Sequence, residues 1–234
     1  MTKKILITGG GSGIGYATAK IFLNNGFQVI IAGRCIKKLK ESYNNLNDSE
    51  LAFYNIDFSK FDDVKLLSQK LGNIGTIIHC AGVNIPNRKI RNLTSEDWQT
   101  VIENNLSSAF NLIKCFLPNM QLAKDGHFIF ISSIAGITPK TSAGAAYSAS
   151  KHALNALCTI LANEEKENKI RSTLICPGEV NTDFLNYRAI PPTKEHRQLI
   201  LQPDDIAEII YFTAALPKHA CIREIIITPT IQEF

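Results

Sequence analysis

Short apolar runs alternate along this chain with longer segments in which hydrophobic residues recur every three or four positions. Seven of these runs have the length and composition of β-strands. The predicted strands are Ile5–Thr8, Gln28–Ala32, Leu51–Asn55, Thr76–His79, Gly126–Ile131, Arg171–Cys176 and Glu224–Thr228. Most positions in these runs are apolar, rather than every second one, so we expect both faces of the sheet to be covered.

The segments between the strands have the period of amphipathic helices. The predicted helices are Ile14–Asn25, Lys37–Leu46, Phe61–Leu71, Ser95–Gln121, Gly144–Asn168 and Pro203–Leu216. We expect Pro118 to bend or end the long fourth helix near its C-terminus. Regular alternation of strand and helix predicts an α/β fold: a Rossmann-like, doubly wound, mainly parallel seven-stranded sheet with helices on both faces.

The domain organisation predicted for residues 1–234 is a single domain, since no linker or internal repeat interrupts the alternation. One segment, Asn181–Gln202, lacks a clear period and contains Pro191 and Pro192. A long irregular segment inside a compact domain is usually functional. We therefore interpret residues 181–202 as a lid over the substrate.

Composition and charge exclude several other classes of protein. The chain is 45% hydrophobic and 20% charged, with a net charge of +4, and its basic residues are scattered rather than arranged in a stripe. We therefore expect no nucleic-acid partner. No run is long enough to cross a membrane, and the apolar run near the N-terminus is too short for a signal peptide. The six cysteines form no CxxC pair or metal-ligand spacing, which favours free thiols, no metal and a cytoplasmic location.

The first predicted strand leads directly into a glycine-rich turn and then a helix. Glycines allow the backbone to approach a pyrophosphate closely, and the helix N-terminus offers free N–H groups. A flexible turn is the alternative, but the position between strand and helix favours a nucleotide site. The residues expected to contact the cofactor here are Gly9, Gly11, Ser12, Gly13, Ile14 and Gly15.

The end of the second strand bears on the choice of cofactor. A carboxylate at this place would select NAD(H) through the ribose 2′-hydroxyl, but the strand ends Ala32-Gly33-Arg34. The guanidinium of Arg34 suits a 2′-phosphate, although it could equally be a solvated charge at the start of a helix. We expect NADP(H) to be preferred, with NAD(H) possible.

A tyrosine and a lysine stand four residues apart in Tyr147-Ser148-Ala149-Ser150-Lys151, which places both on one face of a helix. Tyrosine has a pKa near 10 in water, and a nearby ammonium group favours the tyrosinate. This pair is therefore a candidate acid and base.

The turn, of the form TGxxxGIG, and the later YxxxK pair resemble the motifs of the short-chain dehydrogenase/reductase family. The resemblance implies that Tyr147 is the catalytic acid and base, helped by Lys151, and that Ser133 orients the substrate oxygen. Because the serine precedes the tyrosine by fourteen residues instead of the usual thirteen, Ser132 remains an alternative. Asn105 is implied to hold a water in the proton relay, with Asn104 as its alternative.

The same resemblance supplies further cofactor contacts. It implies that Asp57 binds the adenine amino group, and that Arg34 is typical of NADP(H)-dependent members, although Ser12 stands where many of those carry a basic residue. His79-Cys80-Ala81-Gly82 half matches the family's NNAG, with Ala81 and Gly82 beside the cofactor and His79 as a structural substitute. The family's PGxVxT motif is represented by Pro177, Gly178, Val180 and Thr182.

The substrate implied is a small carbonyl compound or alcohol. The C-terminal tail resembles that of NADP-dependent 3-hydroxy acid (serine-type) dehydrogenases, which suggests small 3-hydroxy acids or a broad set of aldehydes and ketones. A carboxylate on the substrate would need a cation near the lid, for which Arg188 and Lys194 are candidates. The alternatives are a 3-oxoacyl thioester reductase of fatty-acid synthesis and a non-catalytic NADP(H)-binding regulator. The resemblance also implies a homodimer or homotetramer.

Overall fold

The computed structural model describes residues 4–44, 49–188 and 190–232. In this part of the chain seven strands form one parallel sheet in the order β3-β2-β1-β4-β5-β6-β7, with a crossover between β3 and β4. The strands are β1 (Lys4–Thr8), β2 (Gln28–Gly33), β3 (Leu51–Asn55), β4 (Thr76–His79), β5 (Gly126–Ile131), β6 (Ile170–Pro177) and β7 (Glu224–Ile227). The predicted Rossmann-like doubly wound fold is confirmed, and the sheet is parallel throughout.

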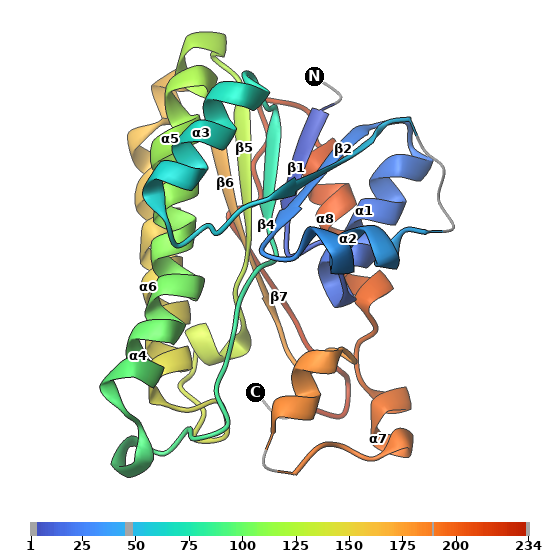
Figure 1. Cartoon of the computed structure of the whole chain (residues 1–234), viewed down its shortest axis with the longest axis vertical. Helices are drawn as coiled ribbons and strands as arrows, with labels where there is room; N and C mark the ends of the chain where they lie inside the picture. The colour runs from blue at the N-terminus through green and yellow to red at the C-terminus, as the bar shows by residue number, and fades with distance from the viewer. Residues whose placement is uncertain (1–3, 45–48, 189, 233–234) are drawn as a thin grey trace.

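Helices cover both faces of this sheet (Figure 1). Helices α3 (Phe61–Leu71), α5 (Ser108–Ala123) and α6 (Ala145–Glu164) lie on one face, and α1 (Gly13–Asn24), α2 (Ile36–Ser42) and α8 (Pro203–Ala215) on the other. Two apolar cores result, one on each face, which explains why the strands are apolar along their whole length. The predicted second helix ends earlier than expected, at Ser42, and the last two positions of its predicted range, 45 and 46, lie outside the described residues.

The long helix predicted over Ser95–Gln121 is more complex than expected. It comprises α4 (Ser95–Ile102), a π-helical turn (Glu103–Ser107) and α5. Pro118 does not end it, because α5 continues to Ala123 and Lys124 ends the helix in the left-handed conformation, with φ of 50°. The irregular turn therefore lies at Asn104 and Asn105 rather than at the proline. Such π-turns frequently occur at functional sites.

The predicted lid forms a compact excursion from the sheet. It contains a 3-10 turn (Asp183–Tyr187) and the short helix α7 (Lys194–Leu199), seen at the lower right of Figure 1. Its two ends are joined because Val180 and Leu201 form a parallel β-bridge. None of the described helices is long and apolar enough to cross a membrane.

Candidate active site

A cleft of about 850 Å³ opens at the carboxyl ends of the strands. In a doubly wound sheet this is the edge where ligands bind, at the place where the strand order reverses. The cleft is lined by most of the residues predicted from the sequence: Gly9, Gly11, Ser12, Ile14, Gly15, Arg34, Asp57, Ala81, Gly82, Ser133, Tyr147, Lys151, Pro177, Gly178, Val180 and Thr182. The other two predicted residues, Gly13 and Asn105, do not line it but contact residues that do.

The glycine turn has no room for side chains at two of its positions. Gly9 has φ of +68°, and a Cβ there would lie 2.8 Å from the backbone nitrogen of Ala81. Gly13 has φ of +50°, and its Cβ would lie 2.9 Å from Cγ2 of Thr182. The turn thus brings bare backbone next to the start of α1, as a phosphate-binding cradle requires, and the residues present fit a dinucleotide.

Positive charge lines the cleft at the ends of β2 and β3. Arg34 and Lys38 both face it, and Asp57 stands beside them. Burial raises the pKa of Asp57, but hydrogen bonds from Ser59 and the charge of Arg34 outweigh it and lower the pKa below its usual value. Asp57 accepts from the Ser59 hydroxyl at 2.7 Å and from its N–H at 3.1 Å, so it is an ionised acceptor within reach of Arg34's field.

Tyr147 and Lys151 share one face of α6, and Ser133 lies opposite them. The Lys151 ammonium is 5.6 Å from the centre of the Tyr147 ring and donates to the Ile131 carbonyl at 2.8 Å. Burial lowers the pKa of Lys151 to about 8. Burial also raises the pKa of Tyr147 to about 12, opposed by hydrogen bonding to Ser133 and by the charge of Arg88. Without a ligand, Tyr147 is therefore a protonated acid at neutral pH.

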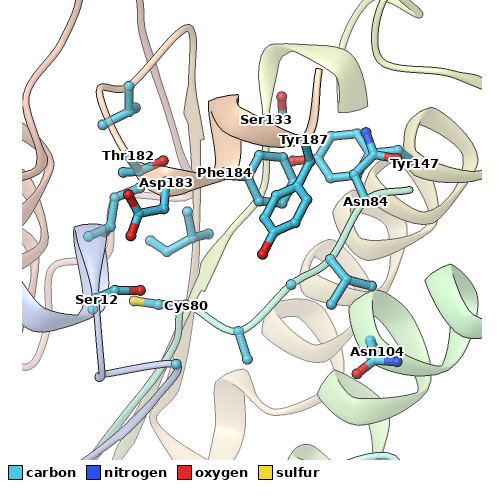
Figure 2. A pocket seen from close by; sticks show the side chains of 18 of the residues that line it. Ser12, Cys80, Asn84, Asn104, Ser133, Tyr147, Thr182, Asp183, Phe184 and Tyr187 are labelled. Atoms are coloured by element: carbon cyan, nitrogen blue, oxygen red, sulfur yellow. The ribbon is translucent and has the colours of Figure 1, made fainter. Parts of the chain in front are cut away.

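The two neighbouring serines have different surroundings. The Ser132 hydroxyl donates to Oδ1 of Asn155 at 2.9 Å and is buried against α6. Both serines line the cleft, but the Ser133 hydroxyl accepts from the Ala135 N–H at 3.1 Å and lies beside Tyr147 (Figure 2). This arrangement favours Ser133 over Ser132 as the group that meets a substrate.

The two candidate asparagines also differ. Asn105 is fully buried in the π-turn, where its side chain bonds both the N–H and the carbonyl of Val83, at 2.7 and 3.0 Å. A Cβ on Gly82 would lie 3.4 Å from Oδ1 of Asn105 and 3.5 Å from Nζ of Lys151, so Gly82 packs against both side chains, of which only Lys151 lines the cleft. Asn104 lines the cleft, where it donates to the Thr100 carbonyl and stands apart from Tyr147 in Figure 2.

His79 takes a structural place at the end of β4. Its two ring nitrogens bond the hydroxyls of Thr8 and Ser108, at 2.8 and 3.1 Å, which ties β1, β4 and α5 together. Burial, aided by the charge of Lys151, lowers the pKa of His79 to about 3. A neutral imidazole with both nitrogens hydrogen-bonded agrees with the interpretation of His79 as a structural residue in place of the family's asparagine.

Arg88 is a residue of the cleft wall that the sequence did not reveal. It follows β4 in an irregular loop, and its guanidinium donates to three carbonyls, those of Ile85, Ser142 and Tyr187. These carbonyls belong to three different loops around the site, including the lid. No periodic pattern or family motif marks this position, and only the approach of the three loops gives it a role.

The base of the lid is held by Glu179. This carboxylate accepts from Arg188 at 2.6 Å and from His196 at 2.7 Å, and the two interactions lower its pKa despite partial burial. Gln232, near the C-terminus, accepts from the Glu179 N–H at 2.8 Å and lines the cleft as well. The tail of the chain thus supports the loop after β6, a contact that the sequence alone did not indicate.

Comparisons with known proteins agree with this geometry. The family described as short chain dehydrogenase matches residues 3–190. An uncharacterised oxidoreductase of Listeria monocytogenes is 31% identical over 243 residues, covering 98% of this chain and 97% of the relative. An uncharacterised oxidoreductase of Staphylococcus aureus is 32% identical over 234 residues, covering 98% of each.

Two solved structures are also similar. The closed form of a serine dehydrogenase complexed with NADP+ has a TM-score of 0.90 and 26% identity, over 99% of this chain and 96% of that one. A metagenomic short-chain oxidoreductase in complex with NADP has a TM-score of 0.83 and 28% identity, over 99% of both chains. This chain is an oxidoreductase by fold and site, and it belongs to the short-chain dehydrogenase family.

Proposed function

We propose that this protein interconverts a carbonyl compound and an alcohol by hydride transfer with NADP(H), using Tyr147 as the acid and base. The observation that carries the proposal is the meeting of Ser133, Tyr147 and Lys151 in the same cleft as the glycine turn. An acid beside a nucleotide cradle is the arrangement that such a transfer needs, because the carbonyl oxygen must gain a proton as its carbon is reduced.

NADP(H) is favoured over NAD(H) by charge. Arg34 and Lys38 line the part of the cleft that follows β2, and no carboxylate stands at the end of that strand. Similar structures at 26% and 28% identity hold NADP+ or NADP. We assign the phosphates to the turn Gly9–Gly15 and the adenine to Asp57. The loop after β6, with Pro177, Gly178, Val180 and Thr182, would hold the nicotinamide.

The protein's own groups have separate roles in this scheme. The cofactor supplies the hydride. Ser133 orients the carbonyl oxygen and Tyr147 donates a proton to it. Lys151 keeps a positive charge near the tyrosine. Asn105, bonded to the Val83 backbone, fixes the loop that follows β4 and packs beside Lys151. The relay of protons through water at Asn105 remains our expectation.

Without a ligand, Tyr147 is in the protonation state that reduction requires. Burial raises the pKa of Tyr147 to about 12, so the hydroxyl holds its proton until an oxygen that needs it is bound. Oxidation of an alcohol requires the tyrosinate, and the positive charge of an oxidised nicotinamide would have to lower this pKa.

A substrate with a carboxylate is the finer part of the proposal, as in the 3-hydroxy acids. The cations first considered for it were Arg188 and Lys194. Arg188 already forms an ion pair with Glu179, and Lys194 does not line the cleft. Arg88, by contrast, lines the cleft. Arg88 uses three of its five N–H groups on carbonyls and has no acidic partner among the described residues. We assign the substrate carboxylate to its remaining donors.

The test is NADPH oxidation, followed by absorbance, with a panel of 3-oxo acids, their methyl esters, neutral aldehydes and acyl thioesters. We expect turnover with the acids, and a KM for them about tenfold higher in Arg88→Met, with partial rescue in Arg88→Lys. The esters should be affected less than twofold. An equal loss on acids and esters would refute the carboxylate contact, and NADPH binding with no turnover on any carbonyl would favour a non-catalytic regulator.

We also propose that the protein forms a homo-oligomer through the outer faces of α5 and α6. Phe110 on α5 is 50% exposed and Ile160 on α6 is 53% exposed. Ala149 and Ala156 are also exposed on α6, and their small side chains allow another helix to approach closely. Light scattering after size exclusion should give a multiple of 25.9 kDa, the mass of one chain. Phe110→Lys should reduce that mass, and a monomeric wild-type protein would contradict the proposal.

A further inference from the structure

Helix α2 is bonded to the glycine turn through two side chains at its C-terminal end. The Ser42 hydroxyl lies 2.7 Å from the Gly11 carbonyl oxygen and 2.9 Å from that of Lys38, and shares its one proton between them. The Tyr43 hydroxyl donates to the Gly10 carbonyl at 2.6 Å. Leu39 packs against the same turn, since a Cβ on Gly11 would lie 2.9 Å from its Cδ2. Three residues of one short segment therefore fix the first half of the turn.

Neither Ser42 nor Tyr43 lines the cleft. Tyr43 is 3% exposed and its ring contacts those of Tyr16 and Phe53 in the core. The carbonyls of Gly10 and Gly11 therefore face Tyr43 and Ser42, two side chains that do not line the cleft. In a planar trans peptide the C=O and the following N–H point in opposite directions, so a carbonyl held on the α2 side directs the next N–H away from α2.

The orientation of these two peptide planes matters to an anion. A carbonyl oxygen facing a phosphate would repel it, whereas an N–H would bind it. Gly11 and Ser12 line the cleft together with Arg34 and Lys38, at the end of β2 where the ribose of a dinucleotide lies. The pyrophosphate is expected at a different part of the turn, because it binds at the N-terminus of α1, which begins at Gly13.

We propose that Ser42 and Tyr43 are positioning residues for the 2′-phosphate of NADP(H), acting through the backbone of Gly10 and Gly11. The inference rests on the proposed use of NADP(H). It accounts for the neutral side chain of Ser12: here the oriented backbone, with Arg34 and Lys38, supplies what a basic residue at that place would otherwise provide. Tyr43 remains a donor at all working pH values, because burial raises its pKa.

The experiment measures binding of two fragments, 2′,5′-ADP and 5′-AMP, by isothermal titration calorimetry. They differ only in the 2′-phosphate. For wild type we expect 2′,5′-ADP to bind more tightly. In Tyr43→Phe, which keeps the ring and removes one donor, the Kd for 2′,5′-ADP should rise about three- to tenfold. Ser42→Ala should act similarly, while the Kd for 5′-AMP changes less than twofold in both variants.

The matched control is Tyr16→Phe, a tyrosine whose ring touches Tyr43 at a centroid distance of 4.9 Å. It should leave both Kd values unchanged. Equal weakening of the two fragments in Tyr43→Phe would show general loosening and overturn the inference, as would unchanged binding in both variants. If Tyr43→Phe fails to fold, Ser42→Ala decides alone. A wild-type protein without preference for 2′,5′-ADP would instead refute the choice of NADP(H).

Discussion

The glycine turn can be tested by adding a single methyl group at Gly9. Two costs follow from the structure. An alanine at φ of +68° adopts the left-handed conformation, which costs about 1–2 kcal/mol. Its Cβ would also lie 2.8 Å from the Ala81 nitrogen and 2.9 Å from the Ala81 Cα, and backbone cannot move aside as a flexible side chain can. Overpacking of this kind adds about 1–3 kcal/mol.

A second glycine lacks the steric clash. Gly72, which follows α3, has φ of +64° and ψ of −131°, and a Cβ there would meet nothing within 4 Å. Gly72→Ala should therefore carry a conformational cost alone, whereas Gly9→Ala carries both costs and should unfold ~4–20 °C below the wild type, the equivalent of about 2–5 kcal/mol for a chain of this size. Differential scanning calorimetry of both variants measures the difference.

The functional consequence of Gly9→Ala should be visible in cofactor binding. Ala81 lines the cleft, so a displaced Ala81 narrows the site for the dinucleotide, whereas Gly72 is not among the residues that line it. NADPH fluorescence titration should show weaker binding in Gly9→Ala and unchanged binding in Gly72→Ala. Equal melting temperatures and equal affinities in the two variants would refute the steric reasoning.

Four further predictions concern the other groups of the site. Tyr147→Phe should abolish turnover while NADPH still binds, and near-normal turnover would remove the catalytic assignment. Arg34→Asp should shift preference toward NADH, measured as the ratio of kcat/KM values, and an unchanged KM for NADPH would contradict the role of its charge. Burial lowers the pKa of Lys151 to about 8, so kcat/KM for reduction should fall above about pH 8 as the ammonium is lost. Arginine is charged at all accessible pH values, so in Lys151→Arg, if it retains activity, kcat/KM should no longer decrease above pH 8. The pKa of His79 is about 3 in the folded state and 6.5 in the unfolded state. Between these pH values only the unfolded state binds the proton. The free energy of unfolding should therefore decrease as the pH is lowered through this window, by up to about 1.4 kcal/mol per pH unit. Urea unfolding of His79→Gln should show a smaller dependence.

The sheet was predictable because its strands follow from burial alone. β3, β4 and β5 have the predicted bounds, β1, β2 and β7 differ by one residue at one end, and β6 is longer by one residue at each end. The π-turn within the long fourth helix was not predictable from the sequence, because it depends on contacts with residues far away in the chain. The side chain of Asn105 bonds the backbone of Val83 across the fold, and the π-turn brings it there. Pro118, a strong local signal, lies on the exposed face of α5 and leaves the helix intact.

The candidate site was predictable where spacing carries the chemistry, as with Tyr147 and Lys151. It was not predictable where loops from different parts of the chain meet. Arg88 reaches carbonyls up to 99 residues away in sequence, and Gln232 is bonded to Glu179 at a separation of 53. From the sequence, Arg188 remained a candidate cation for a substrate carboxylate, since only the fold shows that Glu179 already binds it.

The bridge between Val180 and Leu201 has a consequence for the evolution of this enzyme. The chain leaves the sheet and returns to it at neighbouring points, held by hydrogen bonds from Asn181 to Leu201 and from Leu201 to Glu179. The residues beyond Thr182, which packs against Gly13, can change in length without moving the sheet, because the entropic cost of closing a loop grows only slowly with its length. Insertions, deletions and recombination in residues 183–200 would therefore reshape one wall of the cleft while the sheet and the glycine turn are inherited unchanged.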